Sequence, residues 1–172
     1  MNKILDIQKL NISVDNLLSQ KKLISDISFN IKKSEVVALI GESGSGKSLT
    51  ALSIARLLPS GLKINSGKIF LDDENLFSCT ERKMREIRRS KISMIFQEPM
   101  TAFSPVHTVG NQIIEMIRLH KIMDENEMRL RSIELLRLVG IKDPETRIDS
   151  YPFQLSGGMR QRAMIAMALA SE

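Results

Sequence analysis

A glycine-rich loop between an apolar run and a helical pattern constrains this chain more than any other feature. Residues 41–48 read G-E-S-G-S-G-K-S and match the G-x-x-x-x-G-K-[ST] pattern of phosphate-binding loops. The apolar residues 36–40, of which three are β-branched, predict a strand before the loop, and residues 47–58 predict a helix after it. A strand that enters such a loop and leaves it as a helix is the context this pattern requires. The alternative, a flexible Gly/Ser turn, is disfavoured by both flanks.

Each residue type in this loop suits the binding of an anion. Glycines let the backbone turn its N–H groups inward, and the start of the helix adds partial positive charge. Lys47 is predicted to reach the β- and γ-phosphates of ATP, and the Ser48 hydroxyl is predicted to bind Mg²⁺. The predicted nucleotide-binding residues are Gly41, Glu42, Ser43, Gly44, Ser45, Gly46, Lys47, Ser48 and Leu49.

Length and composition indicate one globular domain. The chain has 172 residues, of which 42% are hydrophobic. No apolar run approaches the ~18 residues of a membrane span, and the N-terminus lacks the apolar core of a secretory signal. The single cysteine, Cys79, excludes an internal disulfide. These features favour the cytoplasm, where work at a membrane would go through a partner.

The net charge of +5 is concentrated in one basic segment. A nucleic-acid surface is one interpretation of this segment, and a solvated helix face is the other. One tyrosine and no tryptophan leave little from which to build a base-stacking surface, so we predict no nucleic-acid partner. The segment comprises Arg82, Lys83, Arg85, Arg88, Arg89 and Lys91.

The predicted elements fall into four regions. Alternating apolar and polar residues predict antiparallel strands in the β-rich start, residues 1–35. The core, residues 36–98, holds the loop, two further short strands and a charged helix. Residues 99–155 predict a helical subdomain, and residues 156–172 predict a last helix capped by Ser156. In detail, strands are predicted at 4–7, 10–14, 27–31, 67–71 and 92–96, and helices at 80–89, 109–120, 124–139 and 159–170, with Gly140 ending the third helix.

A second glycine motif, L-S-G-G-M at residues 155–159, follows later in the chain. By itself, Ser-Gly-Gly before a helix is also consistent with a simple capped turn. Together with the phosphate loop, and with Gln97 between a strand and the helical segment, it resembles the nucleotide-binding domain of ABC transporters. Residues 41–48, 96–105 and 151–162 look like the ATPases of oligopeptide, dipeptide and nickel importers. The similarity covers essentially the whole chain.

The resemblance implies an α/β fold, that of a P-loop NTPase of the ABC type, with an N-terminal antiparallel β subdomain and a helical insertion. Two such domains would meet head to tail around ATP. The phosphate loop would act in cis, whereas the signature residues Leu155, Ser156, Gly157, Gly158 and Met159 would act in trans. Lys47 and Gln97 would be catalytic, and Ser48 and Gln97 would hold Mg²⁺.

The family also implies partners and a place in the cell. Membrane permease subunits and a second ATPase subunit, in a homo- or heterodimer, would bind the chain directly. A solute-binding protein would be linked to it indirectly. The chain would then be a peripheral protein at the cytoplasmic face of the membrane.

The sequence departs from the family pattern in two places. Residues 12–15 offer no aromatic side chain to stack on adenine, as many members do. The sequence also stops at Glu172, before the Walker B strand, the catalytic glutamate, the D-loop and the switch histidine. His107 and His120 precede the signature, and we predict them to be a loop residue and a helix-end residue. The resemblance therefore implies an incomplete central sheet and a chain that does not hydrolyse ATP by itself.

Three functions remain open at this point. The first is the ATP-binding subunit of an ABC importer, which couples ATP binding and hydrolysis to transport of di- or oligopeptides or nickel. The alternative is a non-hydrolysing regulatory fragment that pairs with a complete ATPase subunit. The third is an ATPase of DNA repair or translation, whose usual coiled coil or second cassette does not fit in 172 residues.

Overall fold

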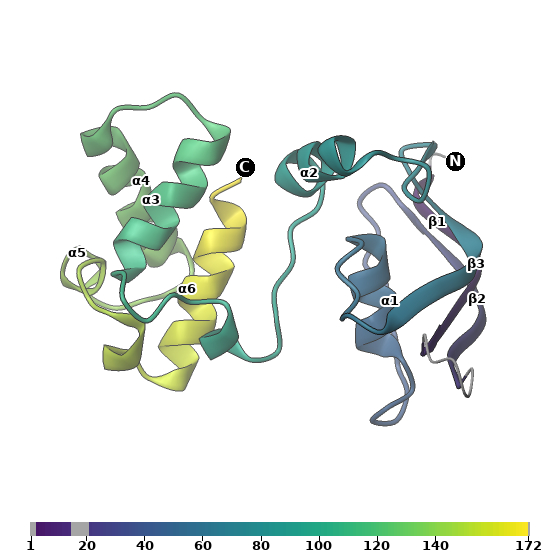
Figure 1. The fold of residues 1–172 in the computed structure, drawn as a ribbon. Coiled ribbons are helices and arrows are strands. Elements are labelled where there is room, and N and C mark those ends of the chain that lie inside the picture. The colour runs from purple at the N-terminus through teal and green to yellow at the C-terminus, as the bar shows by residue number, and fades with distance from the viewer. Residues whose placement is uncertain (1–2, 15–20, 172) are drawn as a thin grey trace. The chain divides into compact units, whose positions relative to one another are not determined.

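The computed structural model describes residues 3–14 and 21–171 and divides into two compact units, residues 1–86 and 87–172 (Figure 1). The first unit contains β1 (Lys3–Val14), β2 (Lys22–Lys32), α1 (Lys47–Ile54), β3 (Leu62–Leu71) and β4 (Glu74–Asn75), and α2 (Glu81–Ser90) crosses the boundary. The second unit contains the short 3₁₀ helix η1 (Pro99–Thr101), α3 (Val109–His120), α4 (Glu125–Leu138), α5 (Pro144–Arg147), the 3₁₀ helix η2 (Pro152–Gln154) and α6 (Gly157–Leu169).

The strands of the first unit form an antiparallel sheet in the order β2-β1-β3-β4, which confirms the predicted β-rich start. The strands predicted at 4–7 and 10–14 are halves of the single strand β1. Leu5 and Ile7 are buried, and so are Leu10 and Ile12, so the alternation slips by one residue between the two pairs. A bulge at Lys9, whose φ is 47°, absorbs the extra residue and keeps both pairs on the buried side.

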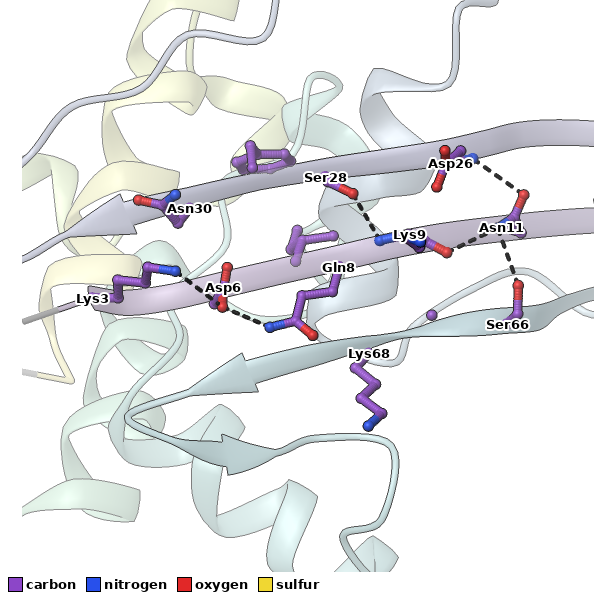
Figure 2. A pocket seen from close by; sticks show the side chains of 13 residues that line it. Lys3, Asp6, Gln8, Lys9, Asn11, Asp26, Ser28, Asn30, Ser66 and Lys68 are labelled. Carbon is purple, nitrogen blue, oxygen red and sulfur yellow. Dashed lines mark hydrogen bonds and ion pairs between the residues drawn. The ribbon is translucent and has the colours of Figure 1, made fainter.

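The two strands that flank β1 are also irregular near this bulge. Asp26 in β2 and Gly67 in β3 also have left-handed φ values, 53° and 109°. Figure 2 shows Asn11 between these strands: its amide nitrogen donates to the Lys9 carbonyl at 2.8 Å and to Ser66 Oγ at 3.1 Å, and its Oδ1 accepts the Asp26 N–H at 3.1 Å. One side chain therefore satisfies backbone groups that the irregular ladder leaves unpaired.

Helix α1 is shorter than the predicted range 47–58, because Arg56 ends it. Arg56 has a left-handed φ of 53°, its N–H donates to Ser53 O at 3.1 Å, and the Leu57 N–H donates to Leu52 O at 2.9 Å. These are the two bonds of a Schellman C-cap. The Arg56 guanidinium donates to the carbonyls of Leu76 at 3.3 Å and Cys79 at 2.6 Å, which holds this turn in place.

The strands predicted at residues 36–40 and 92–96 are wrong for this structure. Both segments are irregular, and large apolar side chains on them are exposed: Val36 at 97%, Ile40 at 94% and Ile95 at 50%. A strand needs a neighbour with which to share backbone hydrogen bonds. Within the described residues, the sheet has no strand beside either segment.

The predicted helices of the second unit are confirmed. Thr108 Oγ1 accepts the Asn111 N–H, Asp124 and Glu127 form a capping box, and Ser156 Oγ accepts the Met159 N–H. Gly140, with φ 77°, follows α4 as predicted. The buried core is Phe103, Val109, Ile113, Ile117, Met128, Leu135, Leu136, Ile141, Ile148, Leu155, Ala163, Met164, Ala166 and Ala170.

The two histidines lie where the sequence predicts them. His107 is in the loop before α3, with Nδ1 3.0 Å from Ser104 Oγ, and His120 is the last residue of α3. The charged helix is α2, on which Arg82 lies 3.9 Å from Glu86. None of the helices within residues 3–14 and 21–171 has the length and apolar character needed to cross a membrane.

A bidentate salt bridge joins α4 to the segment after α5. The Arg129 guanidinium donates to both carboxylate oxygens of Asp149, at 2.9 and 2.7 Å. This hydrogen bond, opposed by partial burial, holds the pKa of Asp149 below its ordinary value. A lowered pKa in the folded state means that the bridge stabilises the fold at neutral pH and loses its effect as pH falls below about 4.

Asp149→Asn is therefore expected to lower the free energy of unfolding at pH 7 by about 0.5 kcal/mol, a small loss because both side chains are exposed. At pH 3 the difference from the wild-type chain should shrink. Urea denaturation followed by the fluorescence of Tyr151, the one tyrosine in the chain, measures both values. If the difference in free energy of unfolding between the variant and the wild-type chain is the same at pH 7 and pH 3, the lowered pKa of Asp149 is not due to this salt bridge.

Candidate functional site

The phosphate loop, residues 41–46, is folded tightly against β2. The Ser45 N–H donates to Glu42 O at 3.2 Å, and Gly44 and Gly46 have φ values of 82° and 91°. A side chain at Gly46 would place its Cβ 2.9 Å from Ile24 Cγ1, in addition to the strained φ. This residue must therefore be glycine for the loop to approach the strand so closely.

Lys47 places its ammonium group against the backbone of the loop. Nζ donates to the carbonyl oxygens of Gly41 at 2.7 Å and Glu42 at 2.6 Å, and it lies 3.2 Å from Ser45 Oγ. The lysine side chain thus folds back across the loop that precedes it in sequence. A full positive charge lies beside a loop of glycines and serines, which is the chemistry of a phosphate site.

The start of α1 adds backbone donors to this charge. Gly46 is the N-cap, and no side chain caps the helix. Gly46 O accepts from the Thr50 N–H at 2.8 Å and from Thr50 Oγ1 at 3.0 Å, which fixes the first turn. The N–H groups of that turn have no partner within the helix and can bind an anion. Ser48 is exposed there and Leu49 is half-buried.

The second glycine motif begins α6 in the other unit. Ser156 is the N-cap, and its Oγ accepts the Met159 N–H at 3.3 Å. Gly157 and Gly158 are exposed in the first turn, whereas Leu155 is buried at 3% and anchors the turn in the core. Residues 155–159 therefore form a second helix start with exposed amides, which is also suited to an anion.

The remaining predicted site residues lie outside these two turns. Gln97 is exposed in the irregular segment before η1, in the second unit. Of the stretch predicted to lie at the adenine, Ile12 and Ser13 are buried in β1 and Val14 is half-buried, while Asp15 lies outside the described residues. The structure thus gathers residues 41–49 on one unit and residues 155–159 on the other.

Sequence reasoning missed Arg162 as a member of the second turn. Its Nε donates to Gly158 O at 3.3 Å and its Nη1 donates to Gly140 O at 3.1 Å, so it ties the start of α6 to the end of α4. The spacing of four residues from Gly158 could have indicated the first contact, because residues i and i+4 are neighbours on a helix. The contact with Gly140 depends on tertiary structure.

Comparison with known proteins identifies a family for this chain. The sequence model of the ABC transporter family matches residues 24–172. A probable peptide ABC transporter ATP-binding protein of Sinorhizobium fredii is 48% identical over 97% of this chain and 50% of its own length. The oligopeptide transport ATP-binding protein AppD of Bacillus subtilis is 52% identical over 86% of this chain and 45% of its own length. The chain therefore spans about half the length of these curated relatives.

A solved structure shares the fold. The dimeric structure of MJ0796, described as a bacterial ABC transporter cassette, matches with a TM-score of 0.86 and 27% identity, over 97% of this chain and 69% of that one. The same cassette in a post-hydrolysis state bound to ADP and Pi gives a TM-score of 0.85 at 27% identity, with the same coverage. The fold is α/β, with the antiparallel sheet and helices of an ABC-type nucleotide-binding domain. On this sequence match and this fold, the chain belongs to the ABC transporter family.

Proposed function

We propose that this chain binds Mg·ATP through residues 41–49 and that the whole protein is the ATP-binding subunit of an importer. The observation that carries the proposal is the Lys47 ammonium, held on a glycine loop at the start of α1. ATP has a polyanionic tail, and this loop offers it a cation and free backbone amides within one turn.

Different residues of the loop would bind different parts of Mg·ATP. Lys47 would exchange its carbonyl partners for oxygens of the β- and γ-phosphates, while the amides of the first turn of α1 would hold the same tail. Mg²⁺ prefers oxygen ligands, and the exposed Ser48 hydroxyl supplies one beside the phosphates. Gln97 is the second proposed metal contact and would also sense the nucleotide. The bound metal would neutralise charge on the phosphates during hydrolysis.

The second turn would serve a second copy or a paralogous subunit. Ser156, Gly157 and Gly158, with Leu155 and Met159 on either side, present amides at the start of a helix of 13 residues. In a head-to-tail dimer these amides would bind the γ-phosphate held by the loop of the partner, so that ATP joins the two subunits.

The names of the relatives support the proposed peptide cargo and the proposed permease partners. Oligopeptide and peptide transport proteins are among them, so di- or oligopeptides are the proposed cargo, with nickel as the second possibility from sequence resemblance. Permease subunits, and a solute-binding protein linked through them, complete such an importer at the cytoplasmic face of the membrane. Because the chain spans about half the length of these relatives, hydrolysis coupled to transport is proposed for the whole protein.

Lys47→Ala should weaken binding of Mg·ATP at least about tenfold, because charge-assisted hydrogen bonds to the phosphates are lost. Isothermal titration of the full chain measures the effect. Lys68→Ala is the matched control, since Lys68 is an exposed lysine of the same unit outside the loop, and it should bind ATP like the wild-type chain. Equal affinities for the wild-type and Lys47→Ala chains would refute the proposed site.

A further inference from the structure

A cavity of about 340 Å³ lies beside the start of α6 in the second unit. The turn after α4 forms one wall, and the first residues of α6 form another. Three cationic side chains and one carboxylate line it, so the lining carries two excess positive charges. The lining residues are Gly140, Ile141, Lys142, Asp143, Arg147, Ser156, Met159 and Arg162.

Two of these cations have no protein partner among the described residues. Arg147 is half-buried, yet its guanidinium makes no ion pair or hydrogen bond with the part of the chain that the structure describes, and the same holds for Lys142. Nearby arginines on the same unit are paired: Arg129 with Asp149 and Arg137 with Glu145. Arg147 and Lys142 therefore carry positive charge that the described chain does not pair, and an anion in the cavity would pair it.

The third cation is already held in position. Arg162 donates from Nε to Gly158 O and from Nη1 to Gly140 O, and these two hydrogen bonds fix its planar guanidinium at the cavity wall. A guanidinium has five N–H donors, so others remain for a ligand. The start of α6 adds partial positive charge on the same side, because Ser156 lines the cavity.

A larger cavity, of about 750 Å³, lies on the sheet of the first unit and differs from this one in the charge of its lining. One ion pair neutralises part of its charge: Lys3 lies 3.3 Å from Asp6, which also accepts from Gln8 at 2.8 Å (Figure 2). Three lysines and two aspartates line this cavity, which leaves one excess positive charge. The cavity beside α6 therefore has the larger excess of positive charge, in a smaller volume.

We propose that the cavity beside α6 binds the phosphate group of a small phosphorylated molecule. A phosphate is a dianion with oxygens that match the fork of a guanidinium, and two excess charges fit it better than a monocarboxylate. Two sources present the same group, and we infer the first: a free phosphorylated molecule, as opposed to the triphosphate of ATP bound by a second copy, which already belongs to the proposed trans site of Ser156. The inference reaches beyond that function to Lys142, Arg147 and Arg162.

The test uses the full chain carrying Lys47→Ala, so that the phosphate loop does not contribute. Inorganic phosphate is titrated while the arginine Nε–H signals are followed by NMR, with chloride at matched ionic strength as the blank. The signals of Arg147 and Arg162 should shift saturably with phosphate, at millimolar concentrations. Arg147→Gln should weaken this binding about tenfold. Arg118→Gln, which removes a charge from an exposed arginine outside the cavity, should leave it unchanged.

The two sources are separated by repeating the titration with ATP at two protein concentrations. A free phosphorylated ligand is supported when phosphate and ATP bind with affinities independent of protein concentration. An effect of ATP alone that grows with protein concentration, in a chain that retains Lys47, would instead indicate the triphosphate held by a second copy and would overturn the inference. Absence of a saturable shift with either probe, or unchanged binding in Arg147→Gln, would overturn the inference. In that case a loss of ATP binding in Lys47→Ala would still support the proposed function, so the two proposals can fail independently of one another.

Discussion

Gly110→Ala is expected to lower the free energy of unfolding of the second unit by about 3 kcal/mol. Gly110 lies in the first turn of α3, where the chain passes the segment before η2. A Cβ at this position would lie 2.3 Å from Ile148 Cγ1 and 2.7 Å from Ile148 O. The Gly110 N–H also donates to Ile148 O at 2.8 Å, so the backbones cannot separate without breaking that bond. Ile148 is fully buried, so any shift of its side chain would disturb the packing of the core.

The measurement is a urea denaturation followed by tyrosine fluorescence. Tyr151 is the one tyrosine, and there is no tryptophan, so the signal comes from the second unit alone. Tyr151 also stacks on Phe153 at 5.5 Å, which makes its emission sensitive to local unfolding. Asn111→Ala, at the exposed neighbouring position, is the control and should change the free energy by less than about 0.5 kcal/mol. A Gly110→Ala chain with the midpoint of the wild type would show that this packing is wrong.

Gly67→Ala should destabilise the sheet of the first unit by a similar amount, about 3 kcal/mol. Gly67 combines a φ of 109° with close approach to the bulge of β1. A Cβ would lie 2.7 Å from both Leu10 Cα and Lys9 O, and 2.9 Å from Gln8 O. All three are backbone atoms, so no side chain can rotate away to make room.

Amide hydrogen exchange in β1 and β3 reports on this second substitution, because tyrosine fluorescence does not sense the sheet. Exchange of the paired amides of Ile7 and Ile69 should accelerate by roughly a hundredfold in Gly67→Ala. Lys68→Ala, at the exposed next residue, should leave the rates near those of the wild-type chain. Protected amides in Gly67→Ala at wild-type rates would mean that the three-strand bulge does not exist as described.

Local signals predicted the parts of the molecule that depend on neighbours in sequence. The helices α3, α4 and α6 have Thr108, Asp124 and Ser156 as N-caps, and each of these side chains accepts the backbone N–H three residues later. The phosphate loop is predictable for the same reason, since the glycine spacing and the lysine lie within eight residues. The two apolar pairs of β1 predicted its burial, but not that a bulge joins them into one strand.

The remaining features depend on residues far apart in the chain. Residues 36–40 and 92–96 have the composition of strands, but a strand forms only where another strand supplies hydrogen-bond partners, and the described residues supply none. The turn that ends α1 is held in place by Arg56, whose guanidinium donates to the carbonyls of Leu76 and Cys79. The cavity of Arg147 and Arg162 likewise exists because α6 returns to the end of α4.

The sequence by itself determined the family, the phosphate loop around Lys47, and the capped helices, because each is encoded in a short run whose chemistry acts between adjacent turns. Only the tertiary structure decided which apolar segments became strands, where glycine is obligatory at positions 67 and 110, and which arginines are left without a carboxylate. Those outcomes depend on the approach of distant backbones to within hydrogen-bond or van der Waals distance, which no local pattern specifies.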